Sequence, residues 1–499
     1  MSSPFISTYH ISKHFQGVQA LKDVSIMIHQ GEIRCLIGEN GSGKSTFIKI
    51  LAGVIRPDKG NIMINDIPVD SLSPRESIQH GIQVIYQDFS LFPNLSIAEN
   101  IAFNTLLEQN KKIINWRQIK SIAKAAMEKL DIRVELHRNV EDVSVADKQL
   151  IAIARALLHD VKLIIMDEPT STLTGHEVDI LFRIIHKLKD NGVSILFVSH
   201  KLKEVLEISE QVSVLRNGHK VAEGPTADFD YSTLVHHMTG RSLNGTRYAY
   251  LDKLPELYTL LQLKNLGMPP AFSDINFSLH ASEILGITGL KGSGHSELAL
   301  ALFGMRHVET GAIYLNGQAI SLNSPQQAIA HGIAYVPEDR LTEGLFLEQS
   351  VKNNTIICIL KSMLRFLGLM DKSALNSETC KWLDELKIVV ASLNMPVNSL
   401  SGGNQQKVVL AKWLATGARI LILNGPTIGV DIGAKMDIHE KIRSLARQGI
   451  GIIVISDDVS ELIQTCHRLL IMHRGRIEEE IYTSEITENQ LTDRLSILK

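Results

Sequence analysis

The stretch that decides the fold is Gly38-Glu39-Asn40-Gly41-Ser42-Gly43-Lys44-Ser45-Thr46, which follows an apolar run at 33–37 and precedes a helix-like run at 46–51. It has the spacing G-x-x-x-x-G-K-[ST] in the strand–loop–helix setting that a phosphate-binding loop requires. The glycines let backbone N–H groups converge on phosphate oxygens at the positive end of the following helix. We therefore expect Lys44 to bind the β- and γ-phosphates and the hydroxyl of Ser45 to ligate Mg²⁺. The alternative, an ordinary glycine-rich turn with a surface lysine, does not explain the flanking pattern.

The composition narrows the class of protein. At 499 residues the chain is too long for one hydrophobic core, and roughly 150 residues per domain predicts two to four domains. Its 44% hydrophobic and 21% charged residues are typical of a soluble globular protein, and its formal net charge of -3 provides no basic field for nucleic acid. The four cysteines have no paired spacing, so a reducing cytoplasm is expected rather than a zinc cluster or a disulfide framework. We expect neither a signal peptide nor a membrane-spanning segment, so that partners would do any spanning.

The chain contains an internal repeat. His80-Gly81-Ile82 recurs as His331-Gly332-Ile333, an offset of 251 (331 minus 80), whereas Pro169 recurs as Pro426, an offset of 257 (426 minus 169). The chain is therefore expected to be a duplicated module of roughly 240 residues. The six extra residues of copy two fall between positions 338 and 401. The predicted domains are residues 1–241 and 256–499, joined by a short polar and aromatic linker at 242–255.

The order of elements within a copy predicts the fold class. Each copy opens with alternating segments, such as 24–28, that predict strands. A helix-rich middle follows the phosphate-binding loop. The copy closes with buried-strand runs at 163–166 and 193–198, separated by a helix at 175–189. This alternation predicts an α/β fold with a mainly parallel sheet that is covered on both faces.

Polar residues follow the buried runs at the positions where parallel strands would end. Asp167 would reach Mg²⁺ and Glu168 would polarise an attacking water. Gln87 follows a predicted strand at 82–86, where its amide could contact Mg²⁺ or the attacking water. His200 follows the run at 193–198 and could contact the γ-phosphate.

Each of these residues also has an ordinary structural interpretation. Two acids after a strand are often a solvated turn, and a lone histidine in that place is more often a helix cap or a surface residue. Phe15 could stack on adenine, although an isolated aromatic residue near the start of a chain usually belongs to the core. Only the combination with Lys44 favours a catalytic site.

A second glycine motif resembles the sequence of a known protein family. The segment Leu400-Ser401-Gly402-Gly403-Asn404-Gln405-Gln406-Lys407 resembles the signature sequence of ATP-binding cassette (ABC) ATPases. A serine and two glycines at a helix start form another anion-binding nest. The resemblance implies that this nest closes over ATP held by the opposite module, so that two ATP molecules lie between head-to-tail modules.

The family pattern also assigns roles to residues of copy one. It implies two P-loop NTPase ABC-type nucleotide-binding domains in tandem, each with an antiparallel β subdomain and a helical subdomain. The residues implied to bind ATP are Phe15, Gly38, Glu39, Asn40, Gly41, Ser42, Gly43, Lys44, Ser45, Thr46, Ser401, Gly402, Gly403 and Gln405. Those implied to act in catalysis are Lys44, Gln87 in the Q-loop, Glu168 of the Walker B acids and His200 as the switch histidine. Those implied to hold Mg²⁺ are Ser45, Gln87 and Asp167.

Two modules in one chain of this length resemble the ATPase of bacterial monosaccharide importers of the ribose, galactose and xylose group. The segments 238–241 and 335–340 also resemble that group. The resemblance implies a peripheral subunit at the cytoplasmic face of the plasma membrane, bound to integral-membrane permease subunits. It further implies an indirect partner, an extracytoplasmic solute-binding protein, and no nucleic acid.

Other functions remain open at this point. Related importers with this layout could carry nucleosides or other small polar solutes. A soluble twin-cassette ATPase acting on the ribosome would also have two modules, but it would carry a long charged linker and two intact signatures. A nucleotide-gated scaffold without enzymatic activity is a third alternative, which the intact copy-one motifs disfavour.

Copy two lacks the catalytic groups of copy one. In the order Lys44, Asp167, Glu168, Gln87, His200 and Phe15, the residues at the matching positions are His295, Asn424, Gly425, Glu338, Asp457 and Leu266. Conversely, copy one has Val145 and Ala146 where copy two has the signature glycines. We therefore predict one hydrolytic site per chain, made by the loop of copy one and the signature of copy two, with Asp431 as the D-loop acid. Whether the loop at 289–296 binds nucleotide stays open.

Overall fold

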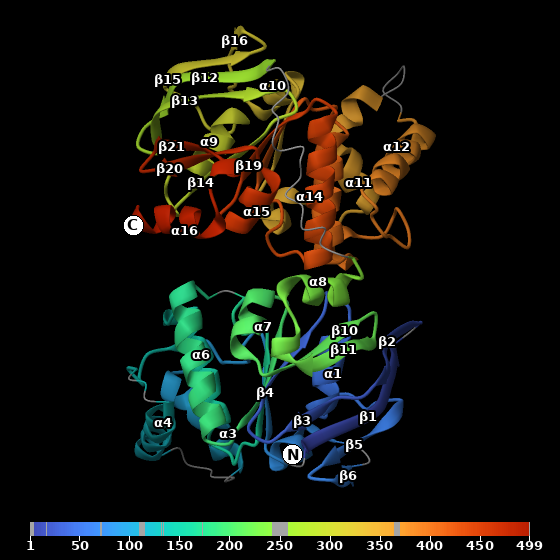
Figure 1. Ribbon diagram of the computed structural model, residues 1–499, viewed down its shortest axis with the longest axis vertical. Helices are drawn as coiled ribbons and strands as arrows, with labels where there is room; N and C mark the ends of the chain where they lie inside the picture. The colour runs from blue at the N-terminus through green and yellow to red at the C-terminus, as the bar shows by residue number, and fades with distance from the viewer. Residues whose placement is uncertain are drawn as a thin grey trace. The chain divides into compact units, whose positions relative to one another are not determined.

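The computed structural model describes residues 4–15, 17–69, 72–108, 115–130, 132, 134–171, 173–241, 258–363 and 370–498. The chain divides into two compact units, 1–243 and 244–499, which run from blue to green and from yellow-green to red in Figure 1. We call them unit 1 and unit 2. The predicted linker at 242–255 lies outside the described residues.

Unit 1 is built on a twisted sheet with strand order β11-β10-β4-β9-β8-β7. All neighbours in this sheet are parallel except β10 and β11. The strands are β4 (Ile33–Ile37), β7 (Ile82–Ile85), β8 (Leu163–Asp167), β9 (Ser194–Ser199), β10 (Gln211–Arg216) and β11 (His219–Pro225). The central strands are buried on both faces, so their sequences are continuous hydrophobic runs, as the sequence predicted.

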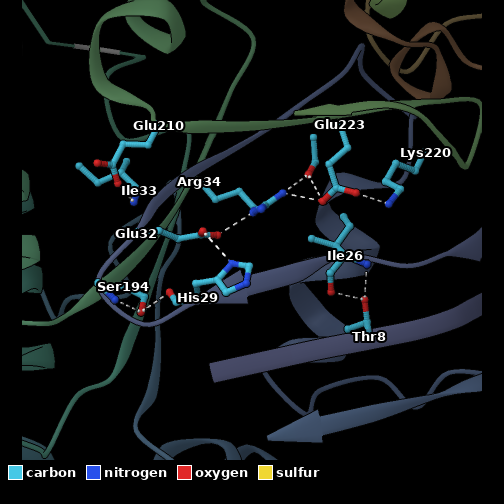
Figure 2. Close-up of polar contacts among 12 residues, drawn as sticks. Thr8, Ile26, His29, Glu32, Ile33, Arg34, Ser194, Glu210, Lys220 and Glu223 are labelled. Carbon is cyan, nitrogen blue, oxygen red and sulfur yellow. Dashed lines mark hydrogen bonds and ion pairs between the residues drawn. The ribbon is translucent and has the colours of Figure 1, made fainter. Parts of the chain in front are cut away.

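A second, antiparallel sheet of unit 1 has the order β2-β1-β5-β6, with β3 also paired to β1. Its strands are β1 (Pro4–Phe15), β2 (Val18–Val24), β3 (Met27–His29), β5 (Lys59–Ile64) and β6 (Ile67–Val69). The predicted single strand at 24–28 is wrong, because β1 pairs with β2 up to Val24 and with β3 from Met27. Between them Ile26 donates its N–H to the hydroxyl of Thr8 over 2.9 Å, which Figure 2 shows.

The helices of unit 1 fall into two groups. A helical subdomain contains α3, α4 and α5, which pack against one another, and the other helices flank the sheets (Figure 1). The helices are α1 (Lys44–Leu51), α2 (Pro74–Gln79), α3 (Ile97–Glu108), α4 (Trp116–Leu130), α5 (Val145–Ala156), α6 (Gly175–Asp190), α7 (Leu202–Ile208) and α8 (Tyr231–Thr239). The predicted helix at 175–189 corresponds to α6.

A buried ion-pair network fixes the start of β4, the strand that leads into the phosphate-binding loop. Arg34 is only 3% exposed. It donates to Glu32 over 2.8 Å, to Glu223 over 2.6 Å and to the hydroxyl of Ser213 over 3.0 Å (Figure 2). A buried guanidinium needs such partners because an unpaired buried charge is strongly destabilising. The network therefore ties β4 to the outer strands β10 and β11.

Unit 2 repeats this architecture. Its main sheet has the order β17-β18-β19-β14-β20-β21 and its antiparallel sheet the order β13-β12-β15-β16. The strands are β12 (Thr259–Met268), β13 (Phe272–His280), β14 (Ile284–Gly289), β15 (Thr310–Leu315), β16 (Gln318–Ile320), β17 (Ile333–Val336), β18 (Ile420–Asn424), β19 (Gly451–Ile455), β20 (Arg468–His473) and β21 (Arg476–Tyr482). The helices are α9 (His295–Leu302), α10 (Pro325–Ala330), α11 (Val351–Ile356), α12 (Lys372–Glu385), α13 (Gly402–Leu414), α14 (Ile432–Arg447), α15 (Val459–Thr465) and α16 (Glu488–Ile497). The predicted tandem α/β architecture, with its antiparallel and helical subdomains, is confirmed.

Candidate nucleotide-binding site

The phosphate-binding loop lies between β4 and α1, as predicted. Its glycines are required by close packing and by backbone conformation. A Cβ atom at Gly38 would lie 2.3 Å from the carbonyl oxygen of Leu215, and one at Gly43 would lie 2.5 Å from that of Ala20. Gly43 also has φ 106°, in the left-handed region that favours glycine. The loop is thus held against β10 on one side and β2 on the other.

Lys44 is the first residue of α1 and is only 6% exposed. Its ammonium donates to the carbonyl oxygens of Gly38 over 2.6 Å and of Glu39 over 2.9 Å. The side chain therefore folds back across the loop that it follows. The next residue, Ser45, is exposed, so its hydroxyl is accessible at the start of the helix.

The two acids lie at the carboxyl end of β8, which is separated from the loop's own strand, β4, by β9 in the sheet order. Glu168 leaves the strand with φ 49°, and its carboxylate lies 3.0 Å from Nδ1 of His200, the residue that follows β9. This hydrogen bond is the main reason why the pKa of Glu168 is lowered from its usual value. The pKa of Asp167 is raised, mainly by burial and then by the charge of Glu168.

These positions share one edge of the sheet because β4, β9, β8 and β7 are parallel neighbours. Their carboxyl ends meet at the edge where ligands of open α/β sheets bind. Gln87 follows β7 at this edge and is exposed, although β7 ends at Ile85, one residue earlier than the predicted strand. The structure thus brings the polar residues that follow these strands in copy one to a common edge.

Phe15 lies on the other sheet, at the end of β1, and is 41% exposed. The Nζ atom of Lys13 lies 5.6 Å from the centroid of its ring. Phe15 pairs with Val18 of β2, and β2 carries Ala20, which contacts the phosphate-binding loop. Phe15 is therefore an exposed residue on a hairpin beside the loop, and not part of the core.

The signature segment begins helix α13 of unit 2. The hydroxyl of Ser401 accepts the N–H of Asn404 over 3.4 Å as the N-cap, and Gly402 and Gly403 form the first turn. Gln405 is buried, and its amide donates to the carbonyl oxygens of Val397 and Leu400. The side chain of Gln405 thus points toward the backbone of the segment that precedes α13, and its hydrogen bonds hold that segment against the helix.

The matching positions of unit 2 keep the backbone and change the chemistry. Gly425 has φ 59°, close to the 49° of Glu168, and donates its N–H to β19 as Glu168 does to β9. His295 lies with Nε2 3.8 Å from Asp457. Asn424 is buried and donates to the hydroxyl of Tyr335 over 3.4 Å. The carboxylates that would hold a metal and activate a water are thus replaced by an amide and a hydrogen atom.

The structure adds one cluster that sequence reasoning missed. Thr170, two residues after Glu168, donates its hydroxyl to Glu204 of α7, and its carbonyl oxygen accepts from Lys201 over 2.7 Å. Lys201 and Glu204 also form an ion pair at 3.1 Å. This cluster holds the loop after β8 against the residue that follows His200. No local sequence pattern predicts this cluster, because its residues lie about 30 positions apart in the chain and meet only in the folded structure.

Comparison with known proteins supports the same assignment. A family model described as ABC transporter matches residues 21–171 and 272–428. The chain is 38% identical over 489 residues to ribose import ATP-binding protein RbsA 2 of Streptomyces avermitilis, covering 98% of this chain and 96% of that protein. It is 39% identical over 487 residues to RbsA 1 of Streptomyces coelicolor, with the same coverage, and 39% identical over 492 residues to RbsA of Clostridium tetani, again covering 98% and 96%. The chain therefore belongs to the ABC transporter family.

Proposed function

We propose that this chain is the ATP-hydrolysing subunit of an importer that takes up a monosaccharide, such as ribose, through separate permease subunits. Relatives that match across 98% of the chain carry the name ribose import ATP-binding protein, which supports the proposal. The observation that carries it is the placement of Lys44, Glu168 and His200 around one edge of the sheet in unit 1. The solute is selected by the permease and an extracytoplasmic solute-binding protein, and no nucleic acid is involved.

The proposal places the chain at the cytoplasmic face of the plasma membrane as a peripheral subunit, since ATP is supplied on that side. Among the described residues, no helix is long and apolar enough to cross a membrane. The spanning path then belongs to the permease, and this chain contributes the work of ATP binding and hydrolysis.

Mg²⁺ fits the residues at the sheet edge. The accessible hydroxyl of Ser45 and the carboxylate of Asp167 are the hard oxygen ligands that this ion takes, and Gln87 can add an amide oxygen. Within the described residues, no group of three or more His, Cys, Asp and Glu forms a metal cage. An ion held by two or three protein oxygens and the phosphates of ATP is consistent with that donor set. When bound, it would neutralise charge on the β- and γ-phosphates.

The side chains of unit 1 then divide the chemistry. Lys44 leaves the carbonyl oxygens of Gly38 and Glu39 for the phosphates, which offer a full negative charge in place of two dipoles. Glu168, whose pKa is lowered, is a carboxylate at neutral pH. As a carboxylate it can orient the attacking water and accept its proton. His200 fixes the carboxylate of Glu168 through Nδ1. Ser401, Gly402 and Gly403 of unit 2 are needed for hydrolysis at the Lys44 loop, with Asp431 beside them.

The test of the catalytic assignment is Glu168→Gln. The amide keeps the shape of the side chain and cannot accept a proton, so kcat for ATP falls by about 10²- to 10⁴-fold while ATP still binds. Phosphate release and nucleotide binding are measured on the same preparations. Glu207→Gln, at an exposed position of α7, is the control and keeps the wild-type rate. A Glu168→Gln rate within twofold of wild type would refute the assignment.

The transport assignment is tested by identifying the protein that binds this chain. The chain, expressed from its own host with an affinity tag, is expected to co-purify with a polytopic membrane protein. ATP hydrolysis by that complex in vesicles should rise when ribose and the solute-binding protein are present. Co-sedimentation with ribosomes instead would favour the soluble twin-cassette alternative, and stimulation by nucleosides but not by sugars would change the solute class.

A further inference from the structure

Unit 2 contains a short turn, Arg340–Gly344, that lies in an insertion relative to unit 1. Matching contacts on its far side locate the insertion. The side chain of Asn100 accepts the N–H of Phe92 over 2.8 Å, and that of Asn354 accepts the N–H of Phe346 over 2.8 Å. Phe92 follows the Q-loop glutamine by five residues, whereas Phe346 follows the matching glutamate by eight. Three of the six extra residues of copy two therefore lie in this turn.

The side chain of Arg340 joins three segments that are far apart in the chain. Its Nη1 donates to the carbonyl oxygen of Ile428 over 2.7 Å, and its Nη2 donates to that of Gly429 over 3.1 Å. Its Nε donates to the side chain of Gln405 in α13 over 3.5 Å. The planar guanidinium presents donors in a fixed fork, so it can hold two successive carbonyl oxygens at once.

The turn itself is fixed at its start by Asp339. One oxygen of this carboxylate accepts the N–H groups of Leu341 and Thr342 over 2.8 and 3.3 Å, and the other accepts the hydroxyl of Thr342 over 2.8 Å. The backbone of Arg340 is thus anchored on one side while its guanidinium is held on the other.

The packing around the guanidinium explains two glycines. A Cβ atom at Gly402, the first signature glycine, would lie 2.9 Å from Nη2 of Arg340 and 3.0 Å from the carbonyl oxygen of Gly429. A Cβ atom at Gly429 would lie 3.1 Å from Nη1. At the two corresponding positions copy one has Val145 and Thr172, and the residues that follow its Q-loop glutamine include no arginine before Phe92. The arginine and the glycines that make room for it therefore occur together in one copy.

We propose that Arg340 is a positioning residue for ATP hydrolysis, which holds the loop after β18 and the start of α13 in one arrangement. The loop carries Asp431, the N-cap of α14, and the helix start carries Ser401 and Gly402. This inference rests on the proposed function, in which these groups serve the ATP bound at Lys44. Arg340 acts on them through the backbone, and a displacement of about 1 Å in such groups can cost roughly 10²-fold in rate.

Arg340→Ala and Arg340→Lys test the role. Lysine keeps the charge and loses the fork, so both variants lower kcat by roughly 10- to 100-fold. The KM for ATP stays within about threefold, since the loop of unit 1 is untouched. Guanidinium ion at low millimolar concentration restores part of the rate of Arg340→Ala and does not affect wild type. Arg306→Ala, at an exposed position of the same unit, is the control and keeps the wild-type rate.

A double-mutant cycle tests the packing independently of catalysis. Gly402→Ala lowers the denaturant midpoint of unit 2 in the wild-type background and lowers it less when Arg340 is already alanine, because the contact at 2.9 Å has been removed. Gly403→Ala is the matched control, since its Cβ would lie 2.5 Å from that of Ala434 and away from Arg340. Gly403→Ala should lower the denaturant midpoint by the same amount in the wild-type and Arg340→Ala backgrounds.

The outcomes separate this inference from the proposed function. If the wild-type chain does not hydrolyse ATP, or if Glu168→Gln keeps the wild-type rate, the proposed function fails and this inference fails with it. If Glu168→Gln loses activity but Arg340→Lys stays within twofold of wild-type kcat, only the role of Arg340 is refuted. Equal effects of Gly402→Ala in the two backgrounds would also refute it.

Discussion

Asp167 and Glu168 are adjacent carboxylic acids whose pKa values are shifted in opposite directions. Burial and the neighbouring charge raise the pKa of Asp167, while the hydrogen bond from His200 lowers that of Glu168. Environments that push two neighbouring pKa values apart are how a site assigns different roles to the same functional group. In the proposed mechanism, the residue stabilised as a carboxylate is the one that acts on water, and Asp167 is the one that would hold a cation.

Asp167→Asn is predicted to stabilise unit 1. A carboxyl group whose folded pKa is raised destabilises the folded state while it is ionised, and it costs nothing below its unfolded pKa of about 3.9. The gain from asparagine is thus largest at neutral and higher pH and is lost as pH falls toward 4. At pH 7 without nucleotide or Mg²⁺, Tm should rise by about 2–4 °C, which corresponds to about 1 kcal/mol in a unit of this size.

Scanning calorimetry at pH 7 and pH 4.5 measures this effect. Asp160→Asn is the control, because the side chain of Asp160 is 88% exposed and should leave Tm unchanged. The same Asp167→Asn protein should lose ATPase activity, since an amide is a poorer Mg²⁺ ligand than a carboxylate. A lower Tm than wild type at pH 7 would contradict the prediction.

At the scale of elements, α5 and α13 both begin with a serine N-cap but differ in the two residues that follow it. Ser144 caps α5 by accepting the N–H of Asp147 over 3.1 Å, and Ser401 caps α13 by accepting that of Asn404. The next two residues of α5 carry side chains, and Val145 is 38% exposed. The first turn of α13 has only glycines there, so no side chain projects from these two positions. Of these two helices, we therefore expect α13 to be the one whose start an anion can approach.

Ser401→Ala and Ser144→Ala form a matched pair that separates capping from catalysis. Each removes an N-cap and should cost about 0.5–2 kcal/mol in the free energy of unfolding of its own unit. Only Ser401→Ala should also lower kcat, by roughly 10²-fold, the effect of losing one preorganised donor. Urea unfolding and steady-state ATP hydrolysis measure the two quantities. Equal losses of kcat in the two variants would show that the signature of copy two has no special role.

At the scale of the whole molecule, the two units share a backbone and differ in chemistry. Gly425 keeps the left-handed conformation of Glu168, so the backbone alone would accept a glutamate as it does in unit 1. The surroundings would have to adjust, since a Cβ atom there would lie 2.4 Å from the end of the Ile428 side chain and 3.3 Å from the side chain of Glu338. Asp457 replaces the histidine that would hold such a carboxylate. Activity is thus expected from one unit only.

Restoring the missing groups of unit 2 is predicted not to restore activity. In a Glu168→Gln background, the triple variant His295→Lys, Asn424→Asp and Gly425→Glu should stay below about a hundredth of the wild-type rate. The variant still has Glu338 at the position of Gln87 and Asp457 at the position of His200. Losing a positioned acid–base group typically lowers the rate by about 10²- to 10⁴-fold. Initial rates of phosphate release measure the outcome. Recovery to more than a tenth of the wild-type rate would contradict the prediction.

Most of the fold could be predicted because its patterns are contiguous. The strand at 33–37 and the helix at 175–189 correspond to β4 and α6, since a buried parallel strand and an amphipathic helix each show their period locally. The strand at 24–28 was wrong because the alternating pattern continues while β1 changes its pairing partner. Pairing partners are set by contacts distant in sequence, which the local pattern does not contain.

The sequence by itself determined the phosphate-binding loop, the acids after the buried strand, the duplication and the loss of catalytic groups from copy two. Each is a matter of residue identity and spacing along the chain. Only the tertiary structure decided that His200 holds Glu168, that Gln405 turns to its own backbone and that Arg340 packs against Gly402. These are distances between segments brought together by parallel strand order and helix packing. A one-dimensional pattern contains no such distances until the chain has folded.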